Sequence, residues 1–324
     1  MAEIYPMHVS YTSRSPIWGG KTLARRFGKT TAGGNNAADA TIGETWELSV
    51  RQDAMSRILD GIYVGMTLGE YIDLSGGAAV GEGFAPGDNF PLLIKFIDAA
   101  DRLSVQVHPD DDYAARVEGG NGKTEMWYII AAEPGAELIM GLRNGIDPAE
   151  FRAAAGRGED VSPLLCRKQV RAGECFFIPS GMIHAIGGGI LIAEIQQNCD
   201  LTYRVWDWGR VDSSGRPREL HVERACDVVR SFTSAEVEAE RFECSRADDV
   251  LASCRYFTVR LGRGGDSLTA GADSFNSVLC FEGQGTVEWS GGSVALAAGE
   301  SIFIPAGLGD YTLRGSARAL ISRV

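Results

Sequence analysis

The chain contains one segment twice, as Ala172-Gly173-Glu174-Cys175-Phe176-Phe177-Ile178-Pro179-Ser180-Gly181 and again as Ala298-Gly299-Glu300-Ser301-Ile302-Phe303-Ile304-Pro305-Ala306-Gly307. Each copy has a tight turn, an apolar run that predicts a buried strand, a proline that ends the strand, and a glycine. Repetition of a supersecondary unit implies two related domains in one chain. We therefore predict a mostly β protein with two related β-barrels.

The repeated pattern is typical of the segment that closes one half of a cupin-type, or jelly-roll, β-barrel. We predict a catalytic N-terminal cupin region over residues 1–230 and a degenerate C-terminal barrel over residues 231–324. A few short helices should connect the strands: Thr67 to Ile72, with Thr67 and Glu70 as a capping box, Asp147 to about Ala155, and His221 to Val229.

The two copies differ at a position that matters for chemistry. Counted from the shared glycine, His184 in the first copy corresponds to Asp310 in the second, and residues 231–324 contain no histidine. The shared residues are therefore expected to be scaffold, whereas His184 is an addition that only the first barrel needs.

The stretch from Leu103 to Asp110 offers further candidates for the interior of the first barrel. Alternation along a strand that Pro109 ends places Ser104, Gln106 and His108 on one face. An isolated histidine is more often a hydrogen-bonded core or surface residue than a ligand. A glutamine two residues before it on the same face, together with the second histidine, favours a ligand role.

The next strand supplies a carboxylate. After a turn at Gly119 to Gly122, the chain re-enters the sheet at Lys123-Thr124-Glu125, a run that is often only a solvated strand start. If this strand pairs beside the previous one, Glu125 faces the same space as Gln106 and His108. Amide, imidazole and carboxylate groups that converge on one point form a site that zinc commonly occupies.

A second cluster of candidates follows His184. Glu194 and Gln196 share one face of a predicted strand, and Arg204 and Arg210 stand among aromatic residues. On composition alone, such arginines are more often in salt bridges at a rim than in contact with a ligand. Beside a metal pocket, however, the planar guanidinium group suits a phosphate.

The composition limits the partners. Lys and Arg number 31 against 43 Asp and Glu, and the net charge of −12 argues against a nucleic-acid partner while leaving room for a small anion. The seven cysteines form no C-x-x-C pair, which suits a reducing compartment. The chain shows no signal pattern and no apolar run of bilayer-spanning length, so we predict a cytoplasmic protein without a membrane partner.

Several of these motifs resemble type I mannose-6-phosphate isomerases in their short bacterial form. The similar segments are Ile17–Gly20, Glu44–Glu47, Leu103–Asp110, Lys123–Tyr128, Ile178–Ala185, Glu194–Asn198 through Arg204, and Arg218–His221. The barrel-closing repeat fits the C-terminal cupin of that family. A general cupin would share the Pro-Gly turn but not the Gln-x-His-Pro and Lys-x-Glu pair.

The resemblance implies one zinc ion per chain, held by Gln106, His108, Glu125 and His184. It also implies that Arg204 is the catalytic-site arginine, that Glu194 is a pocket carboxylate, and that Ser104 and Lys123 line the same cavity. Longer members of the family have a lysine where this chain has Arg210, which we expect to bind substrate together with Ser104 and Arg204.

The reaction that the resemblance implies is the interconversion of mannose 6-phosphate and fructose 6-phosphate through an enediol, with a small phosphorylated sugar as the partner. We favour Glu194 as the base ahead of His108, Lys123 and Asp200. Arg204 would neutralise the enediolate or hold the phosphate, and we favour the first role slightly.

Two other functions compete with this one. A non-catalytic sugar-binding or regulatory bicupin would keep the fold and lose the chemistry, but the complete ligand set, with its arginine and carboxylate, argues against it. A cupin oxygenase with iron favours three histidines, or two with a carboxylate, where this chain has a glutamine.

Overall fold

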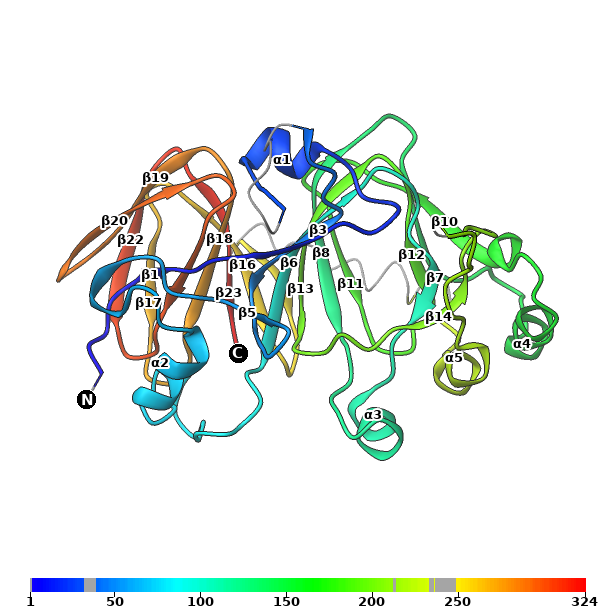
Figure 1. Cartoon of the computed structure of the whole chain (residues 1–324), viewed down its shortest axis with the longest axis horizontal. Coiled ribbons are helices and arrows are strands. Elements are labelled where there is room, and N and C mark those ends of the chain that lie inside the picture. Colours follow the sequence, from blue (N-terminus) through cyan, green and yellow to red (C-terminus); the bar gives the residue numbers. More distant parts are fainter. Residues whose placement is uncertain (1, 32–38, 212–213, 233–235, 237–248) are drawn as a thin grey trace.

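The computed structural model describes residues 2–31, 39–211, 214–232, 236 and 249–324. Two β-rich units stand side by side along the long axis of the molecule, with short helices at the periphery (Figure 1). Each unit is built from two sheets. The prediction of a mostly β protein with a few short helices is confirmed.

The first unit pairs a six-stranded sheet with a five-stranded one. The six-stranded sheet has the order β11 (Cys175–Ile178), β8 (Glu125–Ala132), β13 (Ile190–Gln197), β6 (Leu92–Ala99), β3 (Glu44–Leu48), β2 (Thr12–Arg14). The five-stranded sheet has the order β10 (Leu165–Gln169), β9 (Glu137–Leu142), β12 (His184–Ile186), β7 (Val105–Val107), β14 (Tyr203–Trp206). A small hairpin of β4 (Val50–Arg51) and β5 (Ala54–Met55) follows β3.

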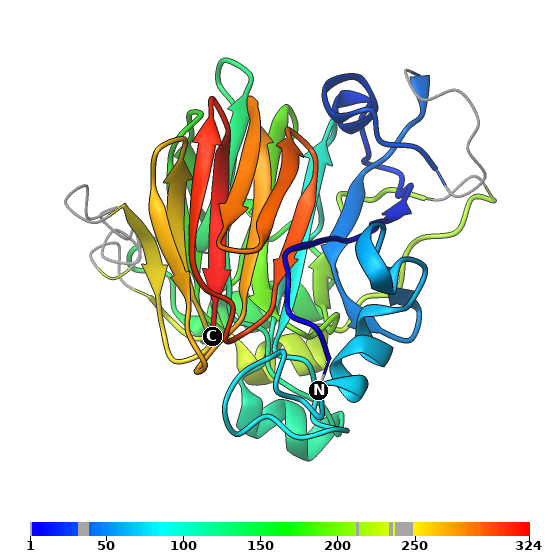
Figure 2. The ribbon, with the colours of Figure 1, turned by 90° about the vertical axis from the view of Figure 1, so that its left-hand side faces the viewer.

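The second unit also has two sheets. The larger has the order β1 (Met7–His8), β21 (Ser301–Ile304), β18 (Asn276–Glu282), β23 (Arg318–Arg323), β16 (Thr258–Arg263), β15 (Val250–Ser253), and the smaller has the order β17 (Ser267–Ala270), β22 (Gly309–Gly315), β19 (Gln284–Trp289), β20 (Gly292–Ala297). Strand β1 pairs antiparallel with β21, so the start of the chain extends a sheet of the second unit. Figure 2 shows this unit with the dark-blue N-terminal segment along its edge.

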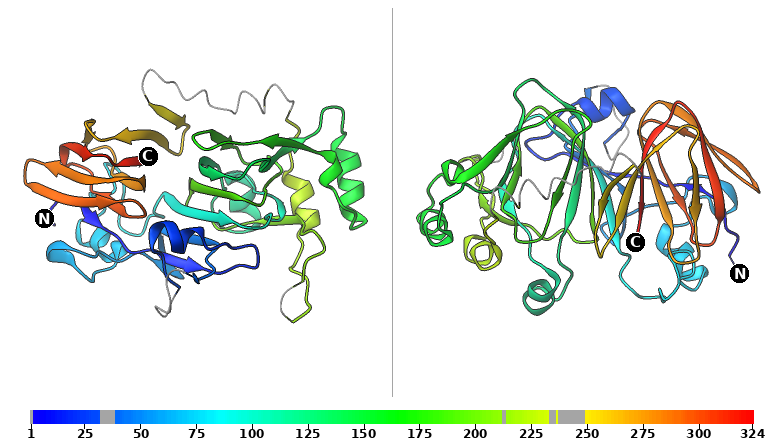
Figure 3. Two further views of the ribbon diagram at one scale, coloured as in Figure 1. Left: turned by 90° about the horizontal axis from the view of Figure 1, so that it is seen from above. Right: turned by 180° about the vertical axis from the view of Figure 1, so that it is seen from behind.

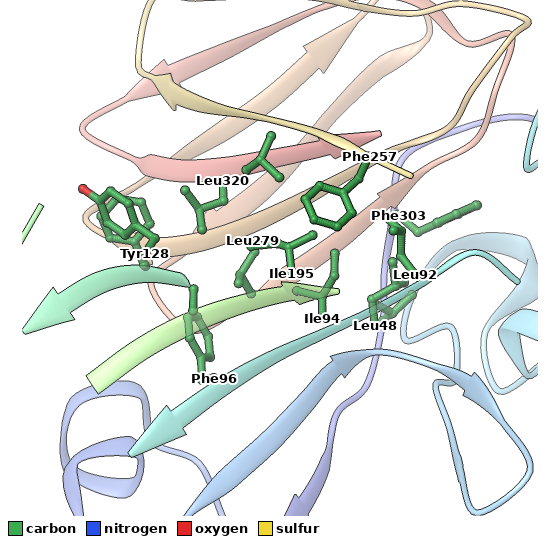
Figure 4. Packing of buried hydrophobic residues seen from close by; sticks show 14 of the residues in the cluster. Leu48, Leu92, Ile94, Phe96, Tyr128, Ile195, Phe257, Leu279, Phe303 and Leu320 are labelled. Carbon is green, nitrogen blue, oxygen red and sulfur yellow. The ribbon is translucent and has the colours of Figure 1, made fainter. Parts of the chain in front are cut away.

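Apolar residues cover both faces of the six-stranded sheet of the first unit. Every residue of β6 and β13 is buried, because this sheet faces the inside of its own unit on one side and the second unit on the other. Ile94, Phe96 and Ile195 pack on the second side against Leu279, Leu320 and other residues of the second unit (Figure 4). A strand that is buried on both faces has apolar residues at successive positions, without alternating polar ones.

The helices are short and lie outside the sheets. They are α1 (Thr22–Phe27), α2 (Leu68–Leu74), α3 (Asp111–Val117), α4 (Pro148–Gly156) and α5 (Val222–Val228), with 3₁₀ turns at Gly61–Tyr63 and Ser162–Leu164. Figure 3 shows α4 and α5 at the end of the first unit that is remote from the second unit, where Phe151 and Val228 cover the outer face of the five-stranded sheet. The expected helices at Thr67, Asp147 and His221 are confirmed.

The strands β7 and β8 are not neighbours. Strand β7 pairs with β12 and β14 in one sheet, whereas β8 pairs with β11 and β13 in the other. The pairing on which the approach of Glu125 to Gln106 depended is therefore wrong. Helix α3, which the sequence analysis did not predict, carries the chain from one sheet to the other.

No helix in the described ranges is long and apolar enough to cross a membrane.

Candidate metal centre and active site

Two rows of polar side chains project into the first unit, one from each sheet. In the five-stranded sheet, Gln106 stands directly opposite His184 on one neighbouring strand and opposite Arg204 on the other. In the six-stranded sheet, Glu194 stands opposite Lys95 and Trp127. Residues directly opposite each other on antiparallel strands point to the same face. Each row therefore presents its polar groups together, although its members are distant in sequence.

The expected metal ligands come together between these rows. One ligand atom from each of His108, Glu125 and His184 lies within 4.8 Å of the others, and all three residues are buried. Glu125 Oε1 is 3.4 Å from His184 Nε2, and Glu125 Oε2 is 3.8 Å from His108 Nε2. The Gln106 amide nitrogen lies 3.4 Å from His184 Nε2, so rotation of this amide would present its oxygen to the same point.

Backbone carbonyls orient both histidines. His108 Nδ1 lies 2.8 Å from the carbonyl oxygen of Leu201, and His184 Nδ1 lies 2.9 Å from that of Met182. Each Nδ1–H therefore donates, which leaves each Nε2 with its lone pair directed inward. Burial lowers the pKa of His108 well below its usual value and that of His184 to about 4. Both rings are neutral at physiological pH, the form that binds a metal.

The positive charge near the Glu125 carboxylate does not balance the effects of its burial and of the neighbouring Glu194. Burial, and next the neighbouring Glu194, raise the pKa of the Glu125 carboxyl to about 7, although Lys123 Nζ lies only 2.7 Å from Oε2. Within the described part of the chain, Oε1 forms no hydrogen bond. A buried carboxylate with a bare oxygen beside two neutral imidazoles fits a divalent cation, and the nitrogen and oxygen donors suit zinc.

Two lysines and Glu194 form a charged cluster beside this group. Lys123 Nζ lies 3.8 Å and Lys95 Nζ 3.4 Å from Glu194 Oε1, while Trp127 Nε1 donates to Glu194 Oε2 at 2.9 Å. Burial would raise the pKa of Glu194, but Lys123 and Lys95 outweigh it and lower that pKa. Burial alone would lower the pKa of Lys123, yet Glu125 and Glu194 raise it. Glu194 is therefore a carboxylate and Lys123 an ammonium group.

A cavity of about 430 Å³ opens onto these groups. Among the residues that line it are the predicted Ser104, Gln106, Lys123, Glu194, Asp200 and Arg204. Three further charged residues line the cavity, Glu44, Lys95 and Arg218, and none of them was among the site residues expected from the sequence. The position of Lys95 in the sequence indicates a place in the site, because it interrupts an otherwise apolar strand. A buried lysine requires a charged partner.

The arginines separate into two groups. Arg204 Nε donates to Ser104 Oγ at 3.2 Å, and burial together with the nearby Arg218 lowers the pKa of Arg204. Arg210 instead donates to the Arg102 carbonyl at 2.6 Å and to Asp207 Oδ1 at 2.6 Å. Arg218, held by two hydrogen bonds to Asp207 at 2.5 and 2.7 Å, is the second arginine that lines the cavity.

Family models match both ends of the chain. Residues 7–132 match the catalytic domain of phosphomannose isomerase type I, and residues 249–324 match the cupin domain of mannose-6-phosphate isomerase. The cupin-type architecture expected from the sequence repeat is thereby confirmed.

Individual relatives cover the whole length. The chain is 35% identical over 325 residues to mannose-6-phosphate isomerase ManA of Bacillus subtilis (strain 168), with 98% of this chain and 99% of that protein aligned. A crystal structure of mannose 6-phosphate isomerase from Bacillus subtilis superposes with a TM-score of 0.83 at 31% identity, and covers 98% of this chain and 99% of the other. A zinc-bound holo mannose 6-phosphate isomerase shares the fold, with a TM-score of 0.75 at 17% identity over 98% of each chain.

Proposed function

This chain belongs to the type I phosphomannose isomerase family and catalyses an aldose–ketose isomerisation, and we propose that it does so with one zinc ion held by Gln106, His108, Glu125 and His184. The substrate is mannose 6-phosphate and the product fructose 6-phosphate. The observation that carries the zinc proposal is the group of two neutral histidines and one under-compensated carboxylate.

The reaction moves a carbonyl between C1 and C2 of an open-chain sugar. A proton leaves one carbon, an enediol forms, and a proton returns to the other carbon on the same face. Because the carbon acid is weak, negative charge that develops on oxygen must be stabilised. A bound zinc ion supplies this stabilisation as a Lewis acid.

Glu194 is the base in this proposal. It lines the cavity, it is ionised because two lysines lower its pKa, and the indole of Trp127 holds one of its oxygens. Its Oε1 remains available to accept the proton. Lys123 is protonated, so it contributes a fixed positive charge beside the developing enediolate rather than acting as the base. Asp200, on the more exposed side of the cavity, is the alternative base.

The charges of the cavity suggest how the sugar lies. Carboxylates and lysines alternate along the wall that carries Glu194, whereas Arg204 and Arg218 bring guanidinium groups to the other side. We place the phosphate at Arg204 and Arg218, together with Ser104, because a guanidinium group binds phosphate oxygens in a fork. This leaves Arg210 outside the substrate site and directs C1 and C2 towards the metal ligands.

The location proposed for the protein is the cytoplasm. None of the six described cysteines, Cys166, Cys175, Cys199, Cys226, Cys254 and Cys280, is in a disulfide bond, which supports a reducing compartment. Cys244 lies outside the described residues.

A coupled assay of fructose 6-phosphate formation tests the function. Dialysis of the purified protein against a strong chelator should abolish turnover and lower the thermal midpoint, and added Zn²⁺ should restore both. Unchanged activity after chelation would remove the metal from the proposal, and a zinc-loaded protein that binds but never converts the sugar would favour the non-catalytic alternative.

The same assay tests the base. Glu194→Gln should lower kcat by roughly 10²–10⁴-fold, since a positioned general base contributes an effect of this order. Glu137→Gln, in the outer part of β9 beside Arg167, serves as the control and should leave kcat unchanged. Near-normal turnover of Glu194→Gln would transfer the role of base to Asp200.

A further inference from the structure

A turn of the second unit contacts helix α3 of the first unit, which precedes strand β8 in the chain. The turn lies between β15 and β16 and carries Arg255 and Tyr256. Tyr256 donates its phenol hydrogen to Asp111 Oδ2 at 2.6 Å, and Arg255 Nη2 donates to the same oxygen at 2.8 Å. Both units therefore meet at one carboxylate on the first turn of α3.

The other oxygen of Asp111 faces the loop that precedes β8. Asp111 Oδ1 accepts hydrogen bonds from the Gly122 backbone N–H and from the side chain of Gln197, both at 2.9 Å. The Gln197 side-chain oxygen in turn accepts from the Thr124 backbone N–H at 2.8 Å. The backbone N–H groups of Gly122 and Thr124, the residues before and after Lys123, are thus held by a single connected network.

The loop has little room to move within this network. A Cβ atom on Gly122 would lie 2.6 Å from the backbone atoms of Asp110 and Asp111, so the glycine allows a close approach to the start of α3. The Lys123 N–H donates to the Pro109 carbonyl at 3.0 Å. These contacts set the backbone from which the Lys123 side chain extends.

Small displacements of Lys123 would alter the site. Its Nζ lies 2.7 Å from Glu125 Oε2 and 3.3 Å from His108 Nε2, in a buried cluster where electrostatic interactions are strong. A shift of about 1 Å in such a group can cost as much as roughly 100-fold in rate.

We propose that Asp111 is a positioning residue for Lys123, and that the second unit, through Tyr256 and Arg255, holds Asp111 in place for this purpose. The kinetic part of this inference rests on the proposed isomerase function. It assigns the C-terminal unit a part in the reaction, although none of its described residues lines the cavity that contains Lys123.

The test compares four variants of the full-length, zinc-loaded protein. Asp111→Ala removes both acceptors. Asp111→Asn keeps an oxygen for Gly122 and Gln197 but turns an NH2 group towards Tyr256 and Arg255, and Tyr256→Phe removes one of the two contacts from the second unit. Tyr113→Phe is the matched control, because Tyr113 on the same helix donates its phenol hydrogen to Asp227, away from the Lys123 loop. Each variant is measured for kcat, KM, thermal midpoint, and amide hydrogen exchange over residues 122–124.

We expect Asp111→Ala to lower kcat by about tenfold, with KM changed by less than about threefold, because the chemical step is affected more than binding. Exchange of the Gly122 and Thr124 amides should become faster. Asp111→Asn and Tyr256→Phe keep an acceptor for Gly122 and Gln197 but weaken the contacts to the second unit, so each should give a smaller effect in the same direction, and Tyr113→Phe should change neither.

Three results would overturn the inference: wild-type exchange at Gly122 and Thr124 in Asp111→Ala, faster exchange there with an unchanged kcat, or an equal loss of kcat in Tyr113→Phe. If Asp111→Ala does not fold, Tyr256→Phe and Asp111→Asn decide the question. A wild-type protein without isomerase activity would reject the proposed function instead, while the exchange data would still test the network.

Discussion

At the level of single residues, the arginines show why composition could not identify which of them line the cavity. Strand β14 ends at Trp206, and the chain then turns through Trp208 and Gly209, which both have positive φ angles (61° and 67°). This turn directs Arg210 away from the cavity, and the returning chain brings Arg218 to it. A residue with positive φ reverses the direction that simple alternation would predict.

Substitution of the two arginines separates their roles. Arg218→Gln should raise KM for mannose 6-phosphate by roughly 10–100-fold, as expected when a charge-assisted hydrogen bond of about 1.5–3 kcal/mol is lost. Arg210→Gln should change KM by less than about threefold, because we place Arg210 outside the substrate site. Steady-state kinetics of both variants measures the difference.

Thermal midpoints must accompany these measurements, since both arginines bind Asp207. If Arg210→Gln weakens substrate binding more than Arg218→Gln at similar stability, the phosphate does not lie where we place it.

At the level of secondary-structure elements, the residues that cap a helix can be recognised in the sequence, because capping depends on side chains within a few residues of the helix start. The capping box of α2 is present as expected: Thr67 Oγ1 accepts from the Glu70 N–H at 3.2 Å, and Glu70 Oε2 accepts from the Thr67 N–H at 2.8 Å. Helix α3 has a comparable N-terminal signal in its sequence. Asp110 caps it by accepting from the Tyr113 N–H at 2.9 Å, directly after the proline that ends the preceding strand.

The capping box gives a stability prediction. Thr67→Ala should lower the free energy of unfolding by about 1 kcal/mol, the usual contribution of an N-cap side chain, and should leave kcat unchanged because α2 is remote from the cavity. Thr67→Ser keeps the hydroxyl and is the matched control. Denaturant unfolding monitored by circular dichroism measures both, and equal midpoints for the alanine and serine variants would contradict the prediction.

At the level of the whole molecule, the two units share a buried interface, and a buried ion pair of the first unit lies against the second unit. Lys29 Nζ lies 2.7 Å from the Glu47 carboxylate, with side chains only 3% and 1% exposed, and Ser301 of the second unit donates to Glu47 at 3.4 Å. A charge this deeply buried must keep its partner.

Breaking this pair should therefore destabilise the protein strongly. Lys29→Met should lower the free energy of unfolding by about 3–5 kcal/mol, since it leaves Glu47 without compensation. The double variant Lys29→Met/Glu47→Leu should recover most of that loss, because apolar replacement of both partners is often close to neutral. Urea unfolding of Lys29→Met, Glu47→Leu and the double variant gives a double-mutant cycle. If the losses of unfolding free energy in the two single variants add up in the double variant, the two groups are not coupled.

Three features could be predicted from the sequence: the repeat, the strand alternation and the helix caps. Each depends on residues that are close together in the chain. They predicted the β architecture with its cupin-type repeat, three of the five described α-helices, and His108, Glu125 and His184 as candidate metal ligands, which the fold does bring together. The approach of Glu125 to Gln106 and His108 was expected from a pairing of β7 and β8 that does not exist.

Three-dimensional packing settled how those groups meet. Gln106 and Glu125 belong to different sheets and approach across the interior of the unit, and Arg218 and Lys95 join the cavity through a turn and a doubly buried strand. Such contacts depend on which faces of distant strands are buried together. That choice is made by the free energy of burying the entire apolar surface, which no local pattern encodes.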